Sequence, residues 1–418
     1  MATNRIPPAW VVGMVTLPFG LVAGFSVTAL PFLLTKIGIS LDRVAVVSAI
    51  VMSPTFWAFL VTPLVDVGLT RRTWSVLTGL VSSCSVGIAL WTLSPSHLPL
   101  FTGLLLVAEL AIVLYSSATG GWQPCFLPDD MRGKVAGWMN AANLGGGALG
   151  SMLFLELAEK FSFRVVGVVS AILSLLPVAL VFVLPTPAPP GLGIRQAFTE
   201  TWLKAWQACR KRECLIGFAL FLSPASCAAA INLFSGLGKD FHSDPQRVIW
   251  VTGAGCAITS AIGAVAGGFL ADRINRGYLY LFSGMAASIC GVIMATTPHS
   301  ATFFTWGVLS YNMAAGFSYA AFSALCFQLV GKDNPVASTV LGLFAAATNG
   351  AIVYMTWIDG LGYRFFGASG LLCLDAVMSL LAAVPLLFLV RSGLRRAKAA
   401  SAPPEKPASL DRSVIPSV

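Results

Sequence analysis

Residues 99–122 read PLFTGLLLVAELAIVLYSSATGGW, an apolar run whose only acidic or basic residue is Glu109. A helix rises about 1.5 Å per residue, so about 20 apolar residues are enough to cross the roughly 30 Å hydrocarbon layer of a bilayer. The run therefore predicts a transmembrane helix. Glu109 lies about ten residues into this run and is expected near the middle of the bilayer.

Comparable runs recur along the whole chain. Its 418 residues are 56% hydrophobic and only 10% charged, whereas soluble proteins carry about 25% charged residues. So little charge cannot coat a water-facing surface, and the recurrence of such runs along the whole chain excludes a soluble domain with a single anchor. The first run is too long for a cleaved signal peptide and is interpreted as a membrane helix. We predict an all-α, polytopic membrane protein with twelve transmembrane helices. The expected spans are residues 9–34, 44–66, 73–92, 99–122, 135–158, 163–185, 214–237, 247–270, 277–297, 301–330, 336–358 and 366–390.

These spans fall into two sets of six, which predicts a two-part molecule. The N-terminal six-helix half is expected over residues 1–185 and the C-terminal six-helix half over residues 214–390. Residues 186–213 are expected to form a cytoplasmic connector between them. Residues 391–418 are basic and rich in Pro and Ser, a composition that predicts a disordered tail.

The connector begins with several prolines, which cannot continue a helix. After them, apolar side chains recur at every fourth position and basic residues take other positions. This spacing predicts an amphipathic helix on the membrane surface. It would act either as a hinge between the halves or as a plain linker. The apolar positions are Ile194, Phe198, Trp202 and Trp206.

Basic residues are unevenly distributed between the two sides of the spans. If the N-terminus is cytoplasmic, 19 of the 26 Lys and Arg residues fall in inner loops and tails, and 7 fall in outer loops. Such an excess of positive charge marks the cytoplasmic side. We expect both termini in the cytoplasm and the chain in the cell inner membrane. The net charge of +9 is then a topology signal and not a nucleic-acid footprint.

Two local matches indicate an internal repeat. Asp66 and Asp272, each followed by basic residues, are 206 positions apart. Asn143 of the fifth span and Asn349 of the eleventh are separated by the same offset. Transporters often contain such repeats, with the substrate site between them near the midplane.

Residues 267–276 resemble the loop motif of the major facilitator superfamily, in which Gly, Asp, Arg and another basic residue follow an even-numbered helix. The resemblance implies that Asp272 faces the start of the fifth helix near Arg132, and Asp66 the start of the eleventh near Lys332. A carboxylate there would meet the positive end of a helix dipole. The alternative is that these residues only set topology. The candidate cytoplasmic gate comprises Asp66, Arg71, Arg132, Gly268, Asp272, Arg273 and Arg276.

Scattered segments also resemble the muropeptide permease (AmpG-like) and acetyl-CoA transporter family, a branch of that superfamily. They are residues 18–24, 63–66, 117–119, 132–133 and 320–325. In that family the Ser-Ala-Thr at the end of the fourth helix is followed by Gln-Asp and a second acid. Here Gly120, Gly121, Trp122 and Gln123 follow instead, so the polar centre of that helix is replaced.

Acidic residues inside spans cost about 2.5–3.5 kcal/mol on insertion scales, so they usually face a cavity or a partner. Because burial favours the neutral form of a carboxyl, a proton could load and leave Glu109. Glu109 is therefore a proton-coupling candidate; the alternative is a protonated carboxyl bonded to a neighbouring helix. Asp375, within the twelfth helix, is expected to brace its neighbours. Asp359 lies near a helix end and is expected to reach water.

Neutral polar side chains at membrane depth form a second set of candidates. Such groups can hydrogen-bond between helices or bind a polar solute in a cavity. The substrate-cavity candidates are Asn140, Asn143, Asn232, Tyr311, Asn312 and Asn349.

Enzyme chemistry finds little support in the sequence. The nine cysteines form no CxxC pair and the three histidines fall in predicted outer loops, so we expect no metal and no cofactor. We expect a monomeric secondary active transporter that moves a small solute by alternating access, with protons as a candidate coupling ion. The alternatives are a non-transporting sensor or lipid-handling protein, or an intramembrane enzyme that uses Glu109.

Overall fold

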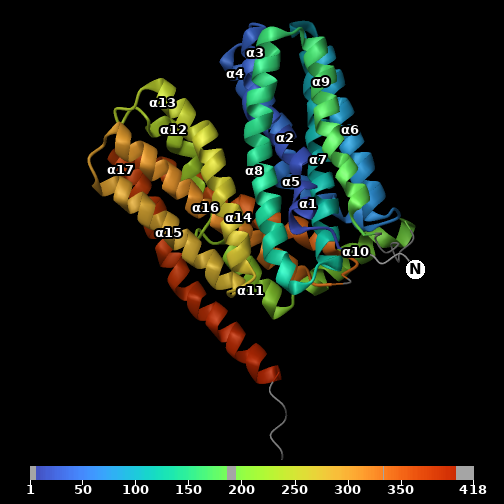
Figure 1. The fold of residues 1–418 in the computed structure, drawn as a ribbon, viewed down its shortest axis with the longest axis vertical. Coiled ribbons are helices and arrows are strands. Elements are labelled where there is room, and N and C mark those ends of the chain that lie inside the picture. Colours follow the sequence, from blue (N-terminus) through green and yellow to red (C-terminus); the bar gives the residue numbers. More distant parts are fainter. Residues whose placement is uncertain (1–5, 186–193, 333, 402–418) are drawn as a thin grey trace, which may run out of the picture.

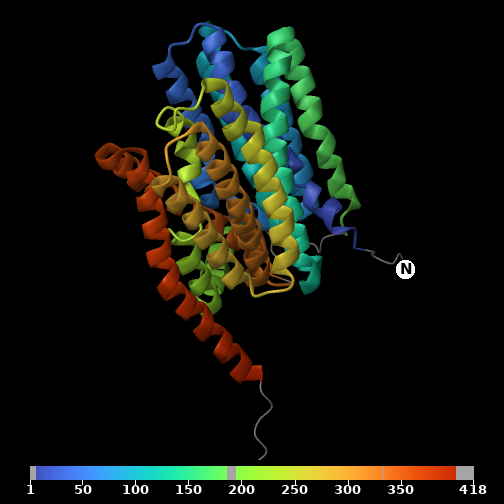
Figure 2. The ribbon, with the colours of Figure 1, turned by 60° about the vertical axis from the view of Figure 1, so that its left-hand side comes forward.

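The computed structural model describes residues 6–185, 194–332 and 334–401, and all regular structure within these ranges is helical. Figure 1 shows α1 to α9 standing together on one side and α11 to α17 on the other. The same grouping is visible after the rotation in Figure 2. The expected all-α membrane fold is confirmed.

The N-terminal group is built from long helices and from spans assembled out of short pieces. Its elements are α1 (Ala9–Met14), α2 (Leu17–Gly24), η1 (Phe25–Ala29), α3 (Leu30–Lys36), α4 (Leu41–Met52), α5 (Pro54–Trp57), η2 (Ala58–Leu60), η3 (Thr62–Asp66), α6 (Arg71–Trp91), η4 (Pro95–His97), α7 (Leu98–Phe126), α8 (Asp129–Lys160), α9 (Phe163–Leu175) and η5 (Leu176–Val183).

The connector and the C-terminal group follow. Their elements are α10 (Ile194–Cys209), α11 (Arg212–Leu222), η6 (Ala229–Leu233), α12 (Phe234–Leu237), α13 (Pro245–Trp250), η7 (Val251–Gly255), α14 (Cys256–Ala271), α15 (Arg276–Thr296), α16 (Ala301–Val330) and α17 (Ala337–Ser401).

Eight helices of the described chain are long and apolar enough to cross a membrane. Together with α8 and two segments built from shorter pieces, they account for the twelve expected spans. α17 contains two spans, because Gly367 has a φ of 66° that turns the chain back on itself. The second and seventh spans consist of shorter pieces. α8 is long but less apolar, because it begins with several charged residues and contains Asn, Gly and Glu further along.

The seventh span differs from the continuous helix expected over residues 214–237. α11 ends at Leu222, and helix resumes only at Ala229. Between them Ser226 and Ala228 have positive φ values of 67° and 55°, which interrupt the helical hydrogen bonding. Non-helical backbone at membrane depth is tolerated where it is buried in protein or lines a cavity.

The end of the chain also differs from expectation. α17 continues through Ser401, so residues 391–401 are helical and not disordered. This stretch is rich in Ala, Leu, Arg and Lys, which are strong helix formers. The remainder of the predicted tail, residues 402–418, and the first part of the connector, residues 186–193, lie outside the described residues.

The two groups meet at the end of the molecule that carries α10 and splay apart at the opposite end, where α13 and the top of α8 are separated (Figure 1). α10 has exposed Leu203 and Trp206 and buried Ala205 and Cys209, as a helix on the membrane surface would. Both ends of the described chain lie toward the α10 end. We refer to it as the closed end and to the other as the open end.

Candidate functional site: two carboxylate latches and the cavities between the halves

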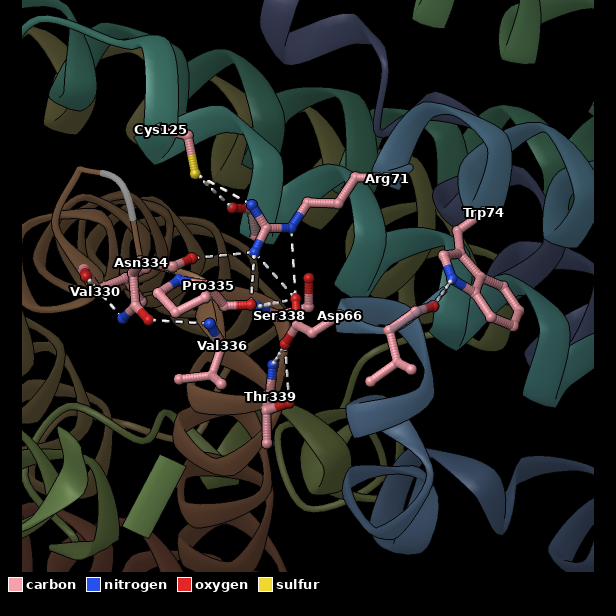
Figure 3. Close-up of polar contacts among 12 residues, drawn as sticks. Asp66, Arg71, Trp74, Cys125, Val330, Asn334, Pro335, Val336, Ser338 and Thr339 are labelled. Carbon is pink, nitrogen blue, oxygen red and sulfur yellow. Dashed lines mark hydrogen bonds and ion pairs between the residues drawn. The ribbon is translucent and has the colours of Figure 1, made fainter. Parts of the chain in front are cut away.

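Asp66 joins the two groups of helices at the closed end (Figure 3). Its Oδ2 accepts hydrogen bonds from the backbone N–H of Thr339 and from the Thr339 hydroxyl, both at 2.8 Å, and its Oδ1 accepts from the Ser338 N–H at 3.3 Å. Arg71 also donates to Oδ1, from Nη2 at 3.0 Å and from Nε at 3.3 Å. The Asp66 side chain is 0% exposed, so the carboxylate is removed from water but fully bonded.

The partners of Asp66 follow from the way α17 begins. The first N–H groups of a helix have no partner within the helix and carry a partial positive charge. α17 begins at Ala337, and Asp66 from the other half supplies the missing acceptor. Arg71 extends the contact by donating from Nη2 to the Asn334 carbonyl at 3.1 Å. We call this arrangement the Asp66 latch.

Asp272, in the C-terminal half, makes the related contact with a helix of the N-terminal half. It follows α14 and accepts hydrogen bonds from the backbone N–H groups of Gly133 at 2.6 Å and Lys134 at 2.9 Å, in the first turns of α8. Arg276 lies 3.7 Å from the carboxylate and donates to the Asp129 carbonyl at 2.7 Å. Burial raises the pKa of Asp272, and the two N–H donors and Arg276 oppose that effect. We call this arrangement the Asp272 latch.

Close packing of glycines accompanies the Asp272 latch. A Cβ atom added to Gly268 would lie 2.5 Å from the Gly133 carbonyl oxygen and 2.7 Å from the Gly137 Cα. Such distances are not possible between real atoms, so α8 and α14 can approach this closely only because these positions lack side chains.

The other residues expected at the gate have separate positions. Arg132 is buried but forms its ion pair with Asp129 at 2.9 Å and not with Asp272. The Arg273 side chain is exposed and makes no hydrogen bond or ion pair with the described residues. Lys332 is also exposed, and the N–H groups that bind Asp66 come from residues further into α17. The contacts to Ser338 and Thr339 were not anticipated, although these positions lie 206 residues beyond Arg132 and Gly133.

A cavity of about 640 Å³ lies between the halves. It is lined by α2, α4, α5 and α7 on one side and by η6 and α17 on the other. Asn232 donates to the Thr356 hydroxyl at 3.1 Å, and Asn349 donates to the Thr55 carbonyl at 3.0 Å. None of the described residues that line this cavity is charged. The polar ones are Thr55, Ser116, Ser117, Asn232, Asn349 and Thr356.

A second cavity of about 520 Å³ opens between the outer part of α8 and the α13–η7–α14 segment. Its lining is mostly apolar and again contains no charged residue of the described chain. Asn312 lies at its inner wall and accepts a hydrogen bond from Ser260 at 3.3 Å. Ile231 and Asn232 are neighbours in η6 but line different cavities, so η6 separates the two spaces.

The remaining cavity candidates lie in contacts between helices. Asn140 is buried and its Nδ2 bonds to the Ser323 hydroxyl at 2.8 Å and to the Tyr319 carbonyl at 3.1 Å, which ties α8 to α16. Tyr311 is buried and donates to Asp375 at 2.9 Å. Asn143 has its backbone packed against Gly20 of α2. None of these three residues lines either cavity described above.

Glu109 is buried within the N-terminal group, with 2% exposure. Its Oε2 accepts a hydrogen bond from the Ser26 hydroxyl at 2.9 Å. Ser26 belongs to η1, a π-helical segment, and such segments often occur at functional sites. The described residues contain no group of three or more His, Cys, Asp or Glu side chains able to hold a metal ion.

Paired helical groups, a repeated acidic latch and cavities between the halves point to a known architecture. The family model of the Major Facilitator Superfamily matches residues 12–353 and, in a second alignment, residues 221–416. The chain belongs to the Major Facilitator Superfamily. It is therefore a multi-pass membrane protein of a transporter family and not an enzyme. None of the curated proteins matches the sequence.

Solved structures of the Major Facilitator Superfamily fold resemble the whole chain. The Escherichia coli fucose:proton symporter FucP gives a TM-score of 0.71 at 10% identity and covers 91% of this chain and 98% of its own. The proton:xylose symporter XylE gives 0.70 at 13% identity, with 90% and 94% covered. A bacterial homologue of the iron transporter ferroportin, in an outward-facing state, gives 0.62 at 16% identity, with 92% and 98% covered. At these identities the likeness shows the fold alone.

Proposed function

We propose that this chain is a secondary active transporter that moves a small solute without net charge across the inner membrane by alternating access. The observation that carries the proposal is the asymmetry between the two ends. Asp66 and Asp272 bind the opposite half at the closed end, whereas the cavities lie between halves that separate at the other end. With the connector in the cytoplasm, this is an outward-facing state.

The solute class follows from the cavity lining. Neither cavity has a charged lining residue, and a charged solute would have to leave water without an opposite charge to replace its hydration. The amides of Asn232 and Asn349 can instead hydrogen-bond to a neutral polar group. The neighbouring apolar residues would contact the rest of the solute.

The latches are proposed to act as the cytoplasmic gate. Each joins a carboxylate of one half to the first turn of a helix in the other half, so neither can persist when the halves separate at that end. The gate as proposed from the geometry consists of Asp66 with Arg71 and Asp272 with Arg276. Gly268 permits the close approach of α8 and α14.

Proton coupling through Glu109 is a further part of the proposal. Burial with a single hydroxyl donor favours a carboxyl that exchanges a proton, and two of the similar structures are those of proton symporters. A distant relation to the muropeptide permease and acetyl-CoA transporter family rests on the short sequence segments alone. It assigns no substrate, because residues 120–123 replace the acids of that family.

Uptake into proteoliposomes tests the function. A panel of neutral sugars, polyols and amphipathic amides is offered with and without an inward proton gradient. We expect gradient-stimulated uptake of one class, a several-fold loss of affinity in Asn232→Ala and Asn349→Ala, and loss of proton dependence in Glu109→Gln. Glu156→Gln, an exposed acid of α8, is the matched control. Absence of gradient-driven uptake of any solute would favour a non-transporting sensor or lipid-handling protein.

A further inference from the structure

Two acidic residues of α17 lie at the same depth in the C-terminal half. Asp359 and Asp375 are each eight residues from Gly367, where the chain turns back. At about 1.5 Å per residue, both lie roughly 12 Å below that turn. The two arms of α17 approach each other closely beside them, since a Cβ atom added to Gly362 would lie 2.8 Å from the Gly370 carbonyl oxygen.

Both carboxyls are buried, and one of them has no hydrogen-bond partner. Asp359 is 0% exposed, and neither of its carboxyl oxygens bonds to the described chain. Its position near a helix end predicts that Asp359 reaches water, and its burial shows that this prediction is wrong. Asp375 is also buried and accepts from the Tyr311 hydroxyl at 2.9 Å. The two carboxyls interact electrostatically.

Among the described residues, no Lys, Arg or His interacts with either carboxyl. The described titratable groups that interact with the pair are Tyr311 from α16 and Cys227 from the break between α11 and η6. Two carboxylates without a cation would repel each other in a medium that solvates neither. At least one of them must carry a proton when the pair is sealed, and the unbonded Asp359 is the carboxyl that gains least from ionisation.

The 640 Å³ cavity between the halves extends to the helical turn that precedes Asp359. Thr356 lines the 640 Å³ cavity and lies three residues before Asp359, on nearly the same face of α17. Asn232 bonds to Thr356 from η6, which is the helix that resumes after the broken segment. Movement of η6 relative to α17 would therefore change the barrier between the cavity and Asp359.

We propose that Asp359 and Asp375 form a proton-exchanging carboxyl pair in the C-terminal half, separate from Glu109. In the exchange, the O–H bond of Asp359 breaks and the proton passes to water at the Thr356 end of the cavity. The exchange starts with both carboxyls protonated, so one proton remains on the pair afterwards. The single negative charge is stabilised by that proton and by the Tyr311 hydroxyl. The proposal rests on the proposed transport function and adds a second proton site to Glu109, but proton exchange itself requires no solute.

Because the solute is unidentified, the test uses the proton alone. Infrared difference spectra of the purified full-length protein in detergent are recorded between acidic and alkaline pH, following the C=O stretch of protonated carboxyls. Asp359→Asn and Asp375→Asn are compared with the natural chain and with Glu159→Gln, an exposed control. We expect each Asp variant to lose a titrating band of a buried carboxyl. A pH-jump dye assay should register about one proton fewer per molecule, while the control keeps the natural count.

Three outcomes would overturn the proposal. The first is an unchanged titration in both Asp variants. The second is loss of the carboxyl band at constant pH when sodium chloride replaces choline chloride, which would make the pair a cation site. The third is a large drop in melting temperature for Asp359→Leu, since an unpartnered carboxyl with no structural role should be replaceable by an apolar side chain without loss. A changed titration together with no solute uptake would sustain the pair and refute the transport function.

Discussion

The Asp66 latch and the Asp272 latch occupy equivalent places in the two halves but differ in strength. Asp66 receives three hydrogen bonds from Ser338 and Thr339 and two from Arg71. Asp272 receives two hydrogen bonds from backbone N–H groups, and its arginine is 3.7 Å away. The sequence around Asp272 resembles the family motif more closely, yet Asp66 is the better bonded carboxylate.

The difference lies in the partner helix and not in the motif. Gly133 lies 206 positions before Thr339. Glycine at the start of α8 lets two backbones pack closely, whereas threonine at the start of α17 adds a hydroxyl donor. The Asp272 latch therefore depends mainly on backbone packing, and the Asp66 latch depends on charge-assisted hydrogen bonds.

The largest effect is expected from removing the better bonded carboxylate. Hydrogen bonds to charged groups contribute about 1.5–3 kcal/mol each and are not additive, so we expect Asp66→Ala to destabilise the closed end by about 3 kcal/mol and Asp272→Ala by about 1.5 kcal/mol. This corresponds to shifts in the gate equilibrium of about a hundredfold and about tenfold. The shift can be measured by double electron–electron resonance. Spin labels are attached to cysteines that replace Leu69 and Lys332 in a variant whose other cysteines are removed. Equal effects of the two substitutions would remove the distinction.

Adding one methyl group should weaken the packed latch selectively. In Gly133→Ala the new Cβ would meet the Gly268 carbonyl and the Asp272 carboxylate, and overpacking of this kind costs about 1–3 kcal/mol. Faster alkylation of a single cysteine placed at the closed end measures the opening. Gly145→Ala, also in α8, meets no atom within 4 Å and should leave the alkylation rate unchanged. If both variants react alike, helix packing is not what holds this contact.

A smaller effect is expected from the hydroxyl that distinguishes the Asp66 latch. Thr339→Val keeps the shape of the side chain but removes the 2.8 Å hydrogen bond to Asp66, which we expect to cost about 1–2 kcal/mol. Hydrogen exchange of the first turn of α17 should accelerate accordingly. Thr339→Ser retains the hydroxyl and serves as the control; protection that is the same in the Val and Ser variants would show that the hydroxyl contributes nothing.

The smallest effect is a pH dependence of the Asp272 latch. Because burial raises the pKa of Asp272, proton binding favours the buried, closed arrangement. Protonation of Asp272 therefore stabilises the closed end. This stabilisation is complete below the ordinary Asp pKa of 3.8 and is lost as the pH rises through the raised pKa of Asp272. Label distances between Asp130 and Arg273 should shift slightly toward closure on acidification, and this shift should be absent in Asp272→Asn. Opening on acidification would reverse the sign and contradict this account.

Much of the fold could be predicted because lipid imposes a simple rule on each span. Apolar runs of sufficient length, such as residues 99–122, indicate helices one at a time. The break after Leu222 was missed because hydropathy alone treats residues 223–228 as part of a span. Pro224, which cannot continue a helix, was the signal in the sequence that could have indicated the break.

The candidate site was less predictable, because its contacts join distant segments. The 206-residue offset related Asp66 to Asp272, but it did not reveal that Thr339 rather than Lys332 would bind Asp66. Asn140 was expected near a cavity and instead bonds to Ser323 across the two halves. Burial of Asp359 depends on how the arms of α17 pack, which its distance from a helix end does not determine.

Breaking the two latches should separate the halves at the closed end and bring them together at the open end. Electron–electron resonance in liposomes can test it with two label pairs, Asp130 with Arg273 at the closed end and Ser162 with Asp244 at the open end. In the double variant Asp66→Ala, Asp272→Ala, we predict a longer distance for the first pair and a shorter distance for the second. A change at one end without an opposite change at the other would contradict the account.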